Sequence, residues 1–223
     1  MTWWLGLIVV PLAGYLVGSV PTALWVGRLL RGVDIRDHGS GNAGATNALR
    51  VFGWKIGLFV LLVDMGKGFV ACWWLWRLGP LLSPAFELLS VSWQLIAGFA
   101  AVLGHIFSVF AGFRGGKGVG TAAGMFLALL PVQTALVILL FVLVTWRFRW
   151  VSLGSLSAAA TLPLLVWVSA RWAAAPIPAP LVWTTTGVAL LIFAAHHQNI
   201  RRLRQGREPR LGEEPQKKGR AGS

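Results

Sequence analysis

Six apolar stretches cover most of this chain of 223 residues. They run over residues 3–26, 54–76, 91–111, 119–146, 151–170 and 181–195. Each approaches or exceeds the roughly 20 helical residues that cross the hydrocarbon core of a bilayer. Hydrophobic residues make up 56% of the chain and charged residues 12%, which leaves too few polar side chains to cover a water-soluble globule. The stretches predict an all-α integral membrane protein. We expect the first stretch to be retained as a span, because no basic segment precedes it.

Basic side chains gather at the ends of the apolar stretches, so the formal net charge of +13 indicates topology and not nucleic-acid binding. One basic group lies in the loop 27–55, and a second follows the last stretch. Under the positive-inside rule both groups face the cytoplasm. The amino terminus is then outside and the carboxyl terminus is cytoplasmic, which requires an odd number of crossings.

Pro131 marks the best place for an additional crossing. It divides the apolar run 118–147, and proline removes a backbone donor and disfavours helix continuation. A break near Leu130 and Pro131 gives two short helices of about 15 residues each, joined outside. We therefore predict seven transmembrane helices, two of them short. Residues 1–211 form one transmembrane domain, and residues 212–223 form a basic, disordered cytoplasmic tail.

The first polar cluster is the loop 38–50. It combines small residues, hydroxyls, two amides and a guanidinium, and its candidate site residues are Ser40, Gly41, Asn42, Asn47 and Arg50. Such a loop can direct backbone N–H groups at an anion, and arginine adds charged donors. A flexible turn is the alternative interpretation.

The second cluster is a glycine-rich run that leads into the apolar stretch beginning at residue 119. It contains Gly115, Gly116, Lys117, Gly118 and Thr121. Free N–H groups at a helix N-terminus, together with a lysine, suit phosphate. The run is not the nucleotide P-loop, because Ala111 and Gly118 occupy positions where that motif requires glycine and a hydroxyl residue. Close helix packing is the alternative role of these glycines.

The third cluster lies at the inner end of the last apolar stretch. His196 and Asn199 are three residues apart and share one helix face, at a membrane boundary where polar groups are costly to bury. Ser152 and Ser155 open the preceding apolar stretch on the same side, where ligand binding and helix packing are both possible roles.

Asp64 and Lys67 are the charged residues deep within the second apolar stretch, three apart on one face. We expect them to pair with each other, and both a structural and a functional role stay open. Glu208 is a weaker candidate, which can latch the tail through an arginine.

These motifs together closely resemble one family. They comprise Gly18-Ser19-Val20-Pro21, the segment 34–50, Gly115-Gly116-Lys117-Gly118-Val119, and His196 and Asn199 followed by Ile200, Arg202 and Leu203. In order and spacing, from about Gly18 to Glu208, they resemble the bacterial acyl-phosphate:glycerol-3-phosphate acyltransferases. The sequence departs from the family at Ser108, where proline is common, and at Gly120, where alanine is usual.

The resemblance implies a bacterial inner-membrane enzyme of seven helices with its active site facing the cytoplasm. It would move a fatty acyl group from acyl phosphate to the 1-hydroxyl of sn-glycerol 3-phosphate, giving lysophosphatidate and inorganic phosphate in phospholipid synthesis. On this basis we assign catalysis to Ser40, Asn42, Arg50, Lys117, His196 and Asn199. Binding of substrate or phosphate is assigned to Gly41, Asn47, Gly115, Gly116, Gly118, Thr121, Ser152 and Ser155. His196 is the candidate proton acceptor by side-chain type, and the phosphate of glycerol 3-phosphate is the alternative.

We expect neither a cofactor nor a metal, because the sequence lacks the acidic cluster that holds Mg²⁺ in lipid phosphotransferases. Acyl phosphate, glycerol 3-phosphate and membrane lipid are the expected partners, and a monomer is compatible with the sequence. An organic-phosphate transporter is the alternative function, since basic residues at broken helices also suit anion translocation. That function requires polar groups on the outer side, where only Arg77, Glu87 and Arg171 are charged.

Overall fold

The computed structural model describes residues 4–83, 90–172 and 177–213, and every regular element in these ranges is helical. Glu87 and the predicted disordered tail from residue 214 onward lie outside the described residues. The long elements are α1 (Leu5–Ser19), α4 (Trp54–Trp73), α6 (Ser90–Ile106), α7 (Val119–Leu129), α8 (Pro131–Phe148), α9 (Val151–Trp172) and α10 (Ala179–Ala195). The shorter ones are α2 (Thr22–Arg31), α3 (Ala45–Phe52), α5 (Leu78–Leu82), α11 (His197–Arg204) and the 3-10 turns η1 (Ile35–Asp37), η2 (Leu75–Arg77) and η4 (Val109–Ala111).

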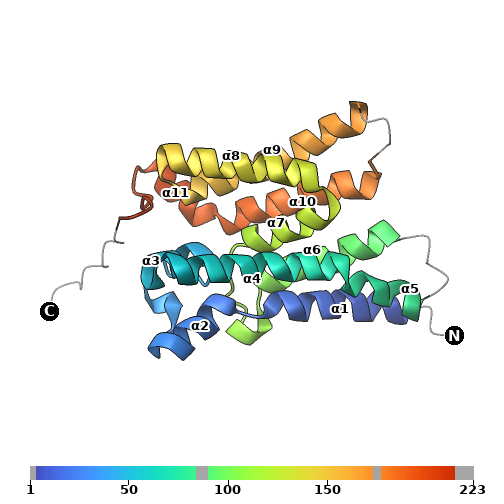
Figure 1. The fold of residues 1–223 in the computed structure, drawn as a ribbon, viewed down its shortest axis with the longest axis horizontal. Helices are drawn as coiled ribbons and strands as arrows, with labels where there is room; N and C mark the ends of the chain where they lie inside the picture. The colour runs from blue at the N-terminus through green and yellow to red at the C-terminus, as the bar shows by residue number, and fades with distance from the viewer. Residues whose placement is uncertain (1–3, 84–89, 173–176, 214–223) are drawn as a thin grey trace.

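The long helices run back and forth along one axis of the molecule (Figure 1). The short helices α2, α3 and α11 gather at one end of this bundle, together with the chain after α11, and we call it the polar end. α5 and the start of α1 lie at the opposite end. Within the bundle α1 packs on α6, α4 on α7, and α8 on α9. The segments that carry the polar clusters are thereby brought to one side of the bundle.

Five helical stretches among the described residues are long and apolar enough to cross a membrane. They are Leu5–Arg31, Trp54–Leu82, Ser90–Ala111, Pro131–Phe148 and Val151–Trp172. A sixth is added if α10 and α11, which are bent by 61° at His196, count as one span. α7 is apolar but shorter. These lengths agree with the sequence-based prediction of an all-helical membrane protein.

The predicted break at Leu130 and Pro131 is confirmed, because α7 ends at Leu129 and Pro131 is the first residue of α8. The prediction of two short helices is wrong for the second one. α7 has 11 residues, since the glycine-rich run delays its start to Val119, whereas α8 has 18 residues and continues to Phe148. At about 1.5 Å per residue, α8 extends roughly 10 Å further toward the polar end than α7 does. The loop that carries Lys117 is therefore recessed inside the bundle.

The first apolar stretch is also more complex than a single span over 3–26. α1 ends at Ser19, and α2 begins at Thr22, with Val20 and Pro21 outside both helices. Proline lacks the backbone donor needed to continue α1 and disfavours helical geometry in the residue before it. α2 then carries the chain to Arg31, at the polar end (Figure 1).

Glycines let the helix backbones touch at two interfaces. A Cβ atom added to Gly18 of α1 would lie 2.0 Å from the Ala101 carbonyl oxygen of α6. One added to Gly124 of α7 would lie 1.8 Å from the Met65 carbonyl oxygen of α4. Small residues permit this close approach, which favours dispersion contacts between apolar helices.

We expect Gly124→Ala to destabilise the folded protein by at least 1–3 kcal/mol, roughly the cost of overpacking, because the backbones of α4 and α7 must separate. Gly66→Ala is the matched control, since a Cβ atom at Gly66 meets nothing within 4 Å. The midpoint of thermal unfolding in detergent is measured for both variants. Equal midpoints for the two would show that the α4–α7 contact does not limit stability.

Candidate active site

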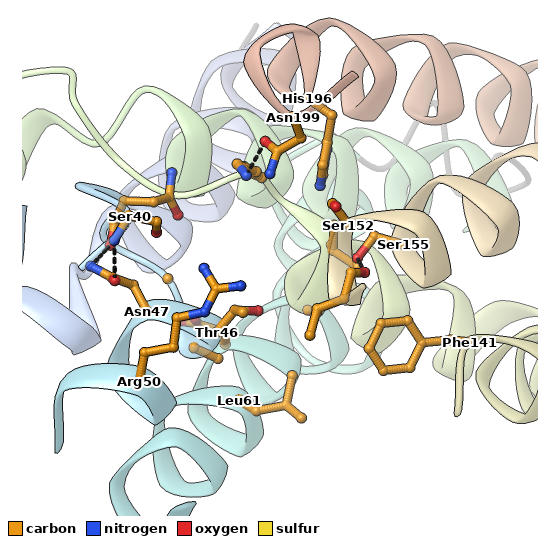
Figure 2. A pocket seen from close by; sticks show the side chains of 18 of the residues that line it. Ser40, Thr46, Asn47, Arg50, Leu61, Phe141, Ser152, Ser155, His196 and Asn199 are labelled. Atoms are coloured by element: carbon orange, nitrogen blue, oxygen red, sulfur yellow. Dashed lines mark hydrogen bonds between the residues drawn. The ribbon is translucent and has the colours of Figure 1, made fainter. Parts of the chain in front are cut away.

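A polar cavity of about 110 Å³ lies where the sequence clusters meet. Nine of the predicted site residues line it: Ser40, Asn42, Asn47, Arg50, Lys117, Ser152, Ser155, His196 and Asn199. Figure 2 shows most of these side chains pointing toward a common space from α3, α9 and the α10–α11 junction. Segments as distant in the sequence as those of Ser40 and Asn199 therefore form one site. Gly41, Gly115, Gly116, Gly118 and Thr121 are not among the residues that line it.

The first turns of four helices contribute residues to the wall of this cavity. Its wall includes Thr46 from the first turn of α3, Gly120 from α7, Ser152 from α9 and Asn199 from α11. Helix N-termini carry unsatisfied N–H groups and a partial positive charge, so they attract anions. Their convergence gives the cavity a preference for negatively charged ligands before any basic side chain is counted.

Two basic side chains add full charges to the same cavity. Neither Arg50 of α3 nor Lys117 has a carboxylate within salt-bridge distance among the described residues. Nη2 of Arg50 donates to the Pro209 carbonyl oxygen at 3.1 Å. The buried Nε of Arg50 has no hydrogen-bond partner among the described residues. Nζ of Lys117 donates to Oδ1 of Asn199 at 2.5 Å. Partly buried cations without a carboxylate in direct contact favour a bound anion.

Burial destabilises the charged forms of Arg50 and Lys117, so both side chains would gain stability from a bound counter-ion. It lowers the pKa of the Lys117 ammonium to about 8, with Glu208 opposing the shift and Arg202 and Arg50 adding to it. Burial likewise lowers the pKa of the Arg50 guanidinium, against the nearby charge of Glu208. A bound phosphate would restore the stability of both charges.

The chain after α11 folds back over the cavity and places Glu208 in its wall. Oε1 of Glu208 accepts from Nδ2 of Asn199 at 2.6 Å, and Oε2 accepts from Nε of Arg202 at 2.6 Å. Burial raises the pKa of Glu208, but these hydrogen bonds outweigh it and the net pKa is lowered. Nε1 of Trp150 donates to the Glu208 carbonyl oxygen at 3.1 Å, which fixes the returning chain to the residue before α9. The predicted contact of Glu208 with an arginine is confirmed by the Arg202 ion pair. The hydrogen bond between Glu208 and Asn199 was not predicted from the sequence.

His196 lies at the junction of α10 and α11 and is 2% exposed. Its Nδ1 lies 2.8 Å from the Ile192 carbonyl oxygen. A carbonyl oxygen only accepts, so Nδ1 carries the hydrogen and Nε2 retains a free lone pair. The ring points toward Ser152 in the cavity (Figure 2). Burial and then the charge of Lys117 lower the pKa of His196 to about 4, so its neutral ring is placed to accept a hydrogen bond.

Asn47 lines the cavity, but its polar atoms hold the loop 35–42 in place. Oδ1 accepts from the Ser40 backbone N–H at 2.8 Å. Nδ2 lies within 3.0 Å of the carbonyl oxygens of Ile35, His38 and Asn42. Asn47 thus positions Ser40 and Asn42. The backbone N–H of Gly41 is similarly occupied, by the His38 carbonyl oxygen at 3.1 Å.

The glycine-rich run serves mainly to position Lys117. The N–H groups of Gly115 and Gly116 donate to the carbonyl oxygens of Ile106 and His105, both at 3.0 Å. A Cβ atom on Gly116 would lie 2.2 Å from Nε2 of His105, so the packing interpretation holds for this part of the run. Gly118 has φ +79°, a conformation that favours glycine, and it starts α7. Thr121 is buried, and its hydroxyl has no partner among the described residues.

The deep side of the cavity holds a polar network that the sequence revealed only in part. Nζ of Lys67 donates to Oδ1 of Asp64 at 2.6 Å, which confirms the predicted pair. The Thr22 hydroxyl donates to the same oxygen at 3.2 Å, and Nδ1 of His105 lies 3.7 Å from it. Asp64 and His105 line the cavity. His105 could have been noted as a polar residue inside an apolar stretch.

Ser155 uses its hydroxyl within α9, where it donates to the Val151 carbonyl oxygen at 3.0 Å.

In the described ranges no group of three or more His, Cys, Asp and Glu side chains is arranged to hold a metal ion.

Residues 8–206 match the family model described as "Glycerol-3-phosphate acyltransferase". The chain belongs to this family. A glycerol-3-phosphate acyltransferase of Chlorobaculum tepidum is 42% identical over 231 residues, covering 95% of this chain and 97% of the relative. One of Salinibacter ruber is 43% identical over 212 residues and covers 92% of each chain.

Two crystal structures of PlsY, described as an integral membrane glycerol 3-phosphate acyltransferase, have the same fold. The glycerol 3-phosphate form is 34% identical, with a TM-score of 0.80, and covers 93% of this chain and 96% of that one. The lysophosphatidic acid form has a TM-score of 0.76 at 32% identity. The family suggested by the sequence motifs is thus confirmed.

Proposed function

We propose that this acyltransferase moves a fatty acyl group from acyl phosphate to the 1-hydroxyl of sn-glycerol 3-phosphate, releasing lysophosphatidate and inorganic phosphate. One observation carries the proposal: the polar cavity shares part of its wall with an apolar groove of about 230 Å³. Leu61, Val119, Phe141 and Ser155 line both. A substrate with a phosphate head and an acyl chain matches this pair of cavities, since each part meets its own kind of surface. The transporter alternative has no comparable support.

The chemistry requires little beyond positioning and charge. The glycerol hydroxyl oxygen attacks the carbonyl carbon of acyl phosphate, and the bond between that carbon and the phosphate oxygen then breaks. Lys117, Arg50 and the helix N-termini stabilise the developing oxyanion and the departing phosphate. The hydroxyl proton passes to Nε2 of His196 or to a substrate phosphate oxygen. Ser40, Asn42 and Asn199 supply the neutral hydrogen bonds that orient the glycerol phosphate.

We further propose seven membrane crossings, by α1, α4, α6, α7, α8, α9 and α10. α1 begins at one end of the bundle and the chain after α11 lies at the other, which is consistent with an odd number of crossings (Figure 1). Arg201, Arg202 and Arg204 belong to α11, which lies at the polar end (Figure 1), and Arg147 and Arg149 stand at the carboxyl-terminal end of α8. The positive-inside rule then places this end, and the site, at the cytoplasmic face of the bacterial inner membrane.

The direct test is a reconstitution. Purified protein supplied with palmitoyl phosphate and glycerol 3-phosphate should release inorganic phosphate and form lysophosphatidate in equal amounts, and chelators should leave the rate unchanged. Product formed from palmitoyl-CoA and not from palmitoyl phosphate would overturn the donor assignment.

The pH dependence of kcat/KM should report Lys117. Because its pKa is lowered to about 8, the ammonium loses its proton as pH rises through this value, and kcat/KM should fall on the alkaline side. Lys117→Arg keeps the charge at these pH values and should move this limb upward, whatever its effect on the maximal rate. An alkaline limb that stays near pH 8 in Lys117→Arg would assign it to another group.

A further inference from the structure

Lys117 stands on a loop whose path is fixed by the end of α6. The N–H groups of Gly115 and Gly116 donate to the carbonyl oxygens of Ile106 and His105, both at 3.0 Å. The His105 side chain adds a second contact. A Cβ atom added to Gly116 would lie 2.2 Å from Nε2 of His105, and its three nearest heavy atoms all belong to this ring. The imidazole therefore lies directly against the residue that precedes Lys117.

The second nitrogen of the His105 ring faces the buried carboxylate of Asp64. Nδ1 of His105 lies 3.7 Å from Oδ1 of Asp64, which is too long for a direct hydrogen bond but close enough for attraction between an N–H group and the carboxylate. Asp64 is itself held in place, because the same oxygen accepts from Nζ of Lys67 at 2.6 Å and from the Thr22 hydroxyl at 3.2 Å. The ring is thus held between a fixed carboxylate and the backbone of Gly116.

Asp64 also contacts the chain on the other side of Lys117. A Cβ atom added to Gly120, in the first turn of α7, would lie 3.3 Å from Cβ of Asp64. The loop is therefore supported before the lysine by His105 and after it by Asp64, and both of these residues line the polar cavity. An ammonium must lie within about 3 Å of a phosphate oxygen to donate to it, so a small shift of this loop changes what Lys117 can bind.

We infer that His105 is a positioning residue for the acyl transfer: its ring, backed by Asp64, sets how far Lys117 enters the polar cavity. This role rests on the proposed function only for the part that Lys117 plays in binding phosphate. Loss of the ring leaves a space behind Gly116, so the loop is free to move and holds the lysine less precisely. A methyl group on Gly116 displaces the same loop by pushing against the ring.

Dissociation constants of glycerol 3-phosphate, measured in detergent without an acyl donor, test this contact. His105→Asn keeps an amide beside Asp64, removes the ring atoms that face Gly116 and should weaken binding about three- to tenfold. Gly116→Ala should weaken binding at least about tenfold in the wild-type background, because the methyl group overlaps the ring. In the His105→Asn background the same change should cost less than about twofold, since the space is then free.

Gly115→Ala is the matched control for Gly116→Ala. A Cβ atom on Gly115 would lie 2.0 Å from the His105 carbonyl oxygen, which no change of the side chain removes. Its cost should therefore be the same in both backgrounds. His105→Gln is a second variant that serves if His105→Asn does not fold. Its flexible chain yields to a methyl group where the rigid ring does not, so Gly116→Ala should again cost less than about threefold.

The pH dependence of the same binding separates positioning from a purely structural role. Wild-type affinity should fall as pH rises through the Lys117 pKa of about 8. His105→Asn should move this fall to higher pH by at least about half a unit, since burial is the main cause of the low pKa and a loosened loop lets the lysine reach water. The other charged or titratable groups around Lys117 are the same in both proteins, namely Glu208, Arg202, Arg50 and His196.

Two results would overturn the positioning role of His105. One is an equal cost of Gly116→Ala in the wild-type and variant backgrounds. The other is weaker binding by a folded His105→Asn protein whose pH profile has not moved. If the affinities follow the expected pattern but the wild-type protein forms no lysophosphatidate, the proposed reaction is refuted and the positioning role stands.

Discussion

Replacing Lys117 by alanine should lower kcat/KM by about 10²–10³, the usual effect of removing one charged donor from a preorganised oxyanion or phosphate site. Lys117 is the basic side chain that hydrogen-bonds to Asn199 within the cavity, and its loop is held by backbone bonds to α6. Its loss removes charge from the point where phosphate is expected to accumulate charge as it leaves. Steady-state kinetics with acyl phosphate and glycerol 3-phosphate measure the effect.

Lys55→Ala is the control for this change. Lys55 is an exposed lysine at the start of α4, does not line the cavity and lies over the Trp54 ring at 5.9 Å. Its replacement removes the same charge from the protein and should leave kcat/KM within about twofold, as for an ordinary surface substitution. Equal losses in the two variants would mean that overall charge, and not the site, governs the rate.

Replacing Asp64 by alanine should destabilise the protein by about 3–5 kcal/mol, because it leaves the Lys67 ammonium buried without its counter-ion. Asp64 and Lys67 are 3% and 6% exposed. Among the described residues, Nζ of Lys67 has one other hydrogen-bond partner, the Val20 carbonyl oxygen at 2.5 Å. For a protein of this size the thermal midpoint should fall by roughly 10 °C.

The double variant Asp64→Ala with Lys67→Met separates the pair from the individual side chains. It removes both charges and should recover a large part of the lost stability, as expected for a buried ion pair replaced by apolar groups. A double variant less stable than Asp64→Ala alone would show that Lys67 stabilises the fold through the Val20 carbonyl and not through Asp64.

Much of the site could be predicted from the sequence because polar residues are rare and costly in an apolar chain. Arg50, Lys117, His196 and Asn199 stand at the borders of apolar stretches, and the structure brings all four to one cavity. The break at Pro131 was predictable for a local reason, the missing backbone donor of proline. These inferences used residue type and position along a single helix.

Features that depend on long-range contacts were not predictable in this way. Glu208 reaches the cavity only because the chain reverses after α11, and this reversal is held by Arg50 of α3 and by Trp150, which lies between α8 and α9. Asn47 looked like a ligand from its side chain, yet its amide is used within its own loop. Sequence spacing also could not show that α7 starts deep in the bundle, since the length of α8 sets that depth.

The glycine contacts described for the bundle also determine which parts of it can move. Gly18 touches the backbone of Ala101, and Gly124 touches the backbone of Met65. Because no flexible side chain separates the helices at these points, one helix of each pair cannot slide past the other without a steric clash. α1 and α6, and likewise α4 and α7, should therefore behave as stiff pairs. The groove lies between α4 and α7 on one side and α8, α9 and α10 on the other. Breathing that admits a lipid chain should therefore be confined to this seam, which the Lys117–Asn199 hydrogen bond of the polar cavity also crosses.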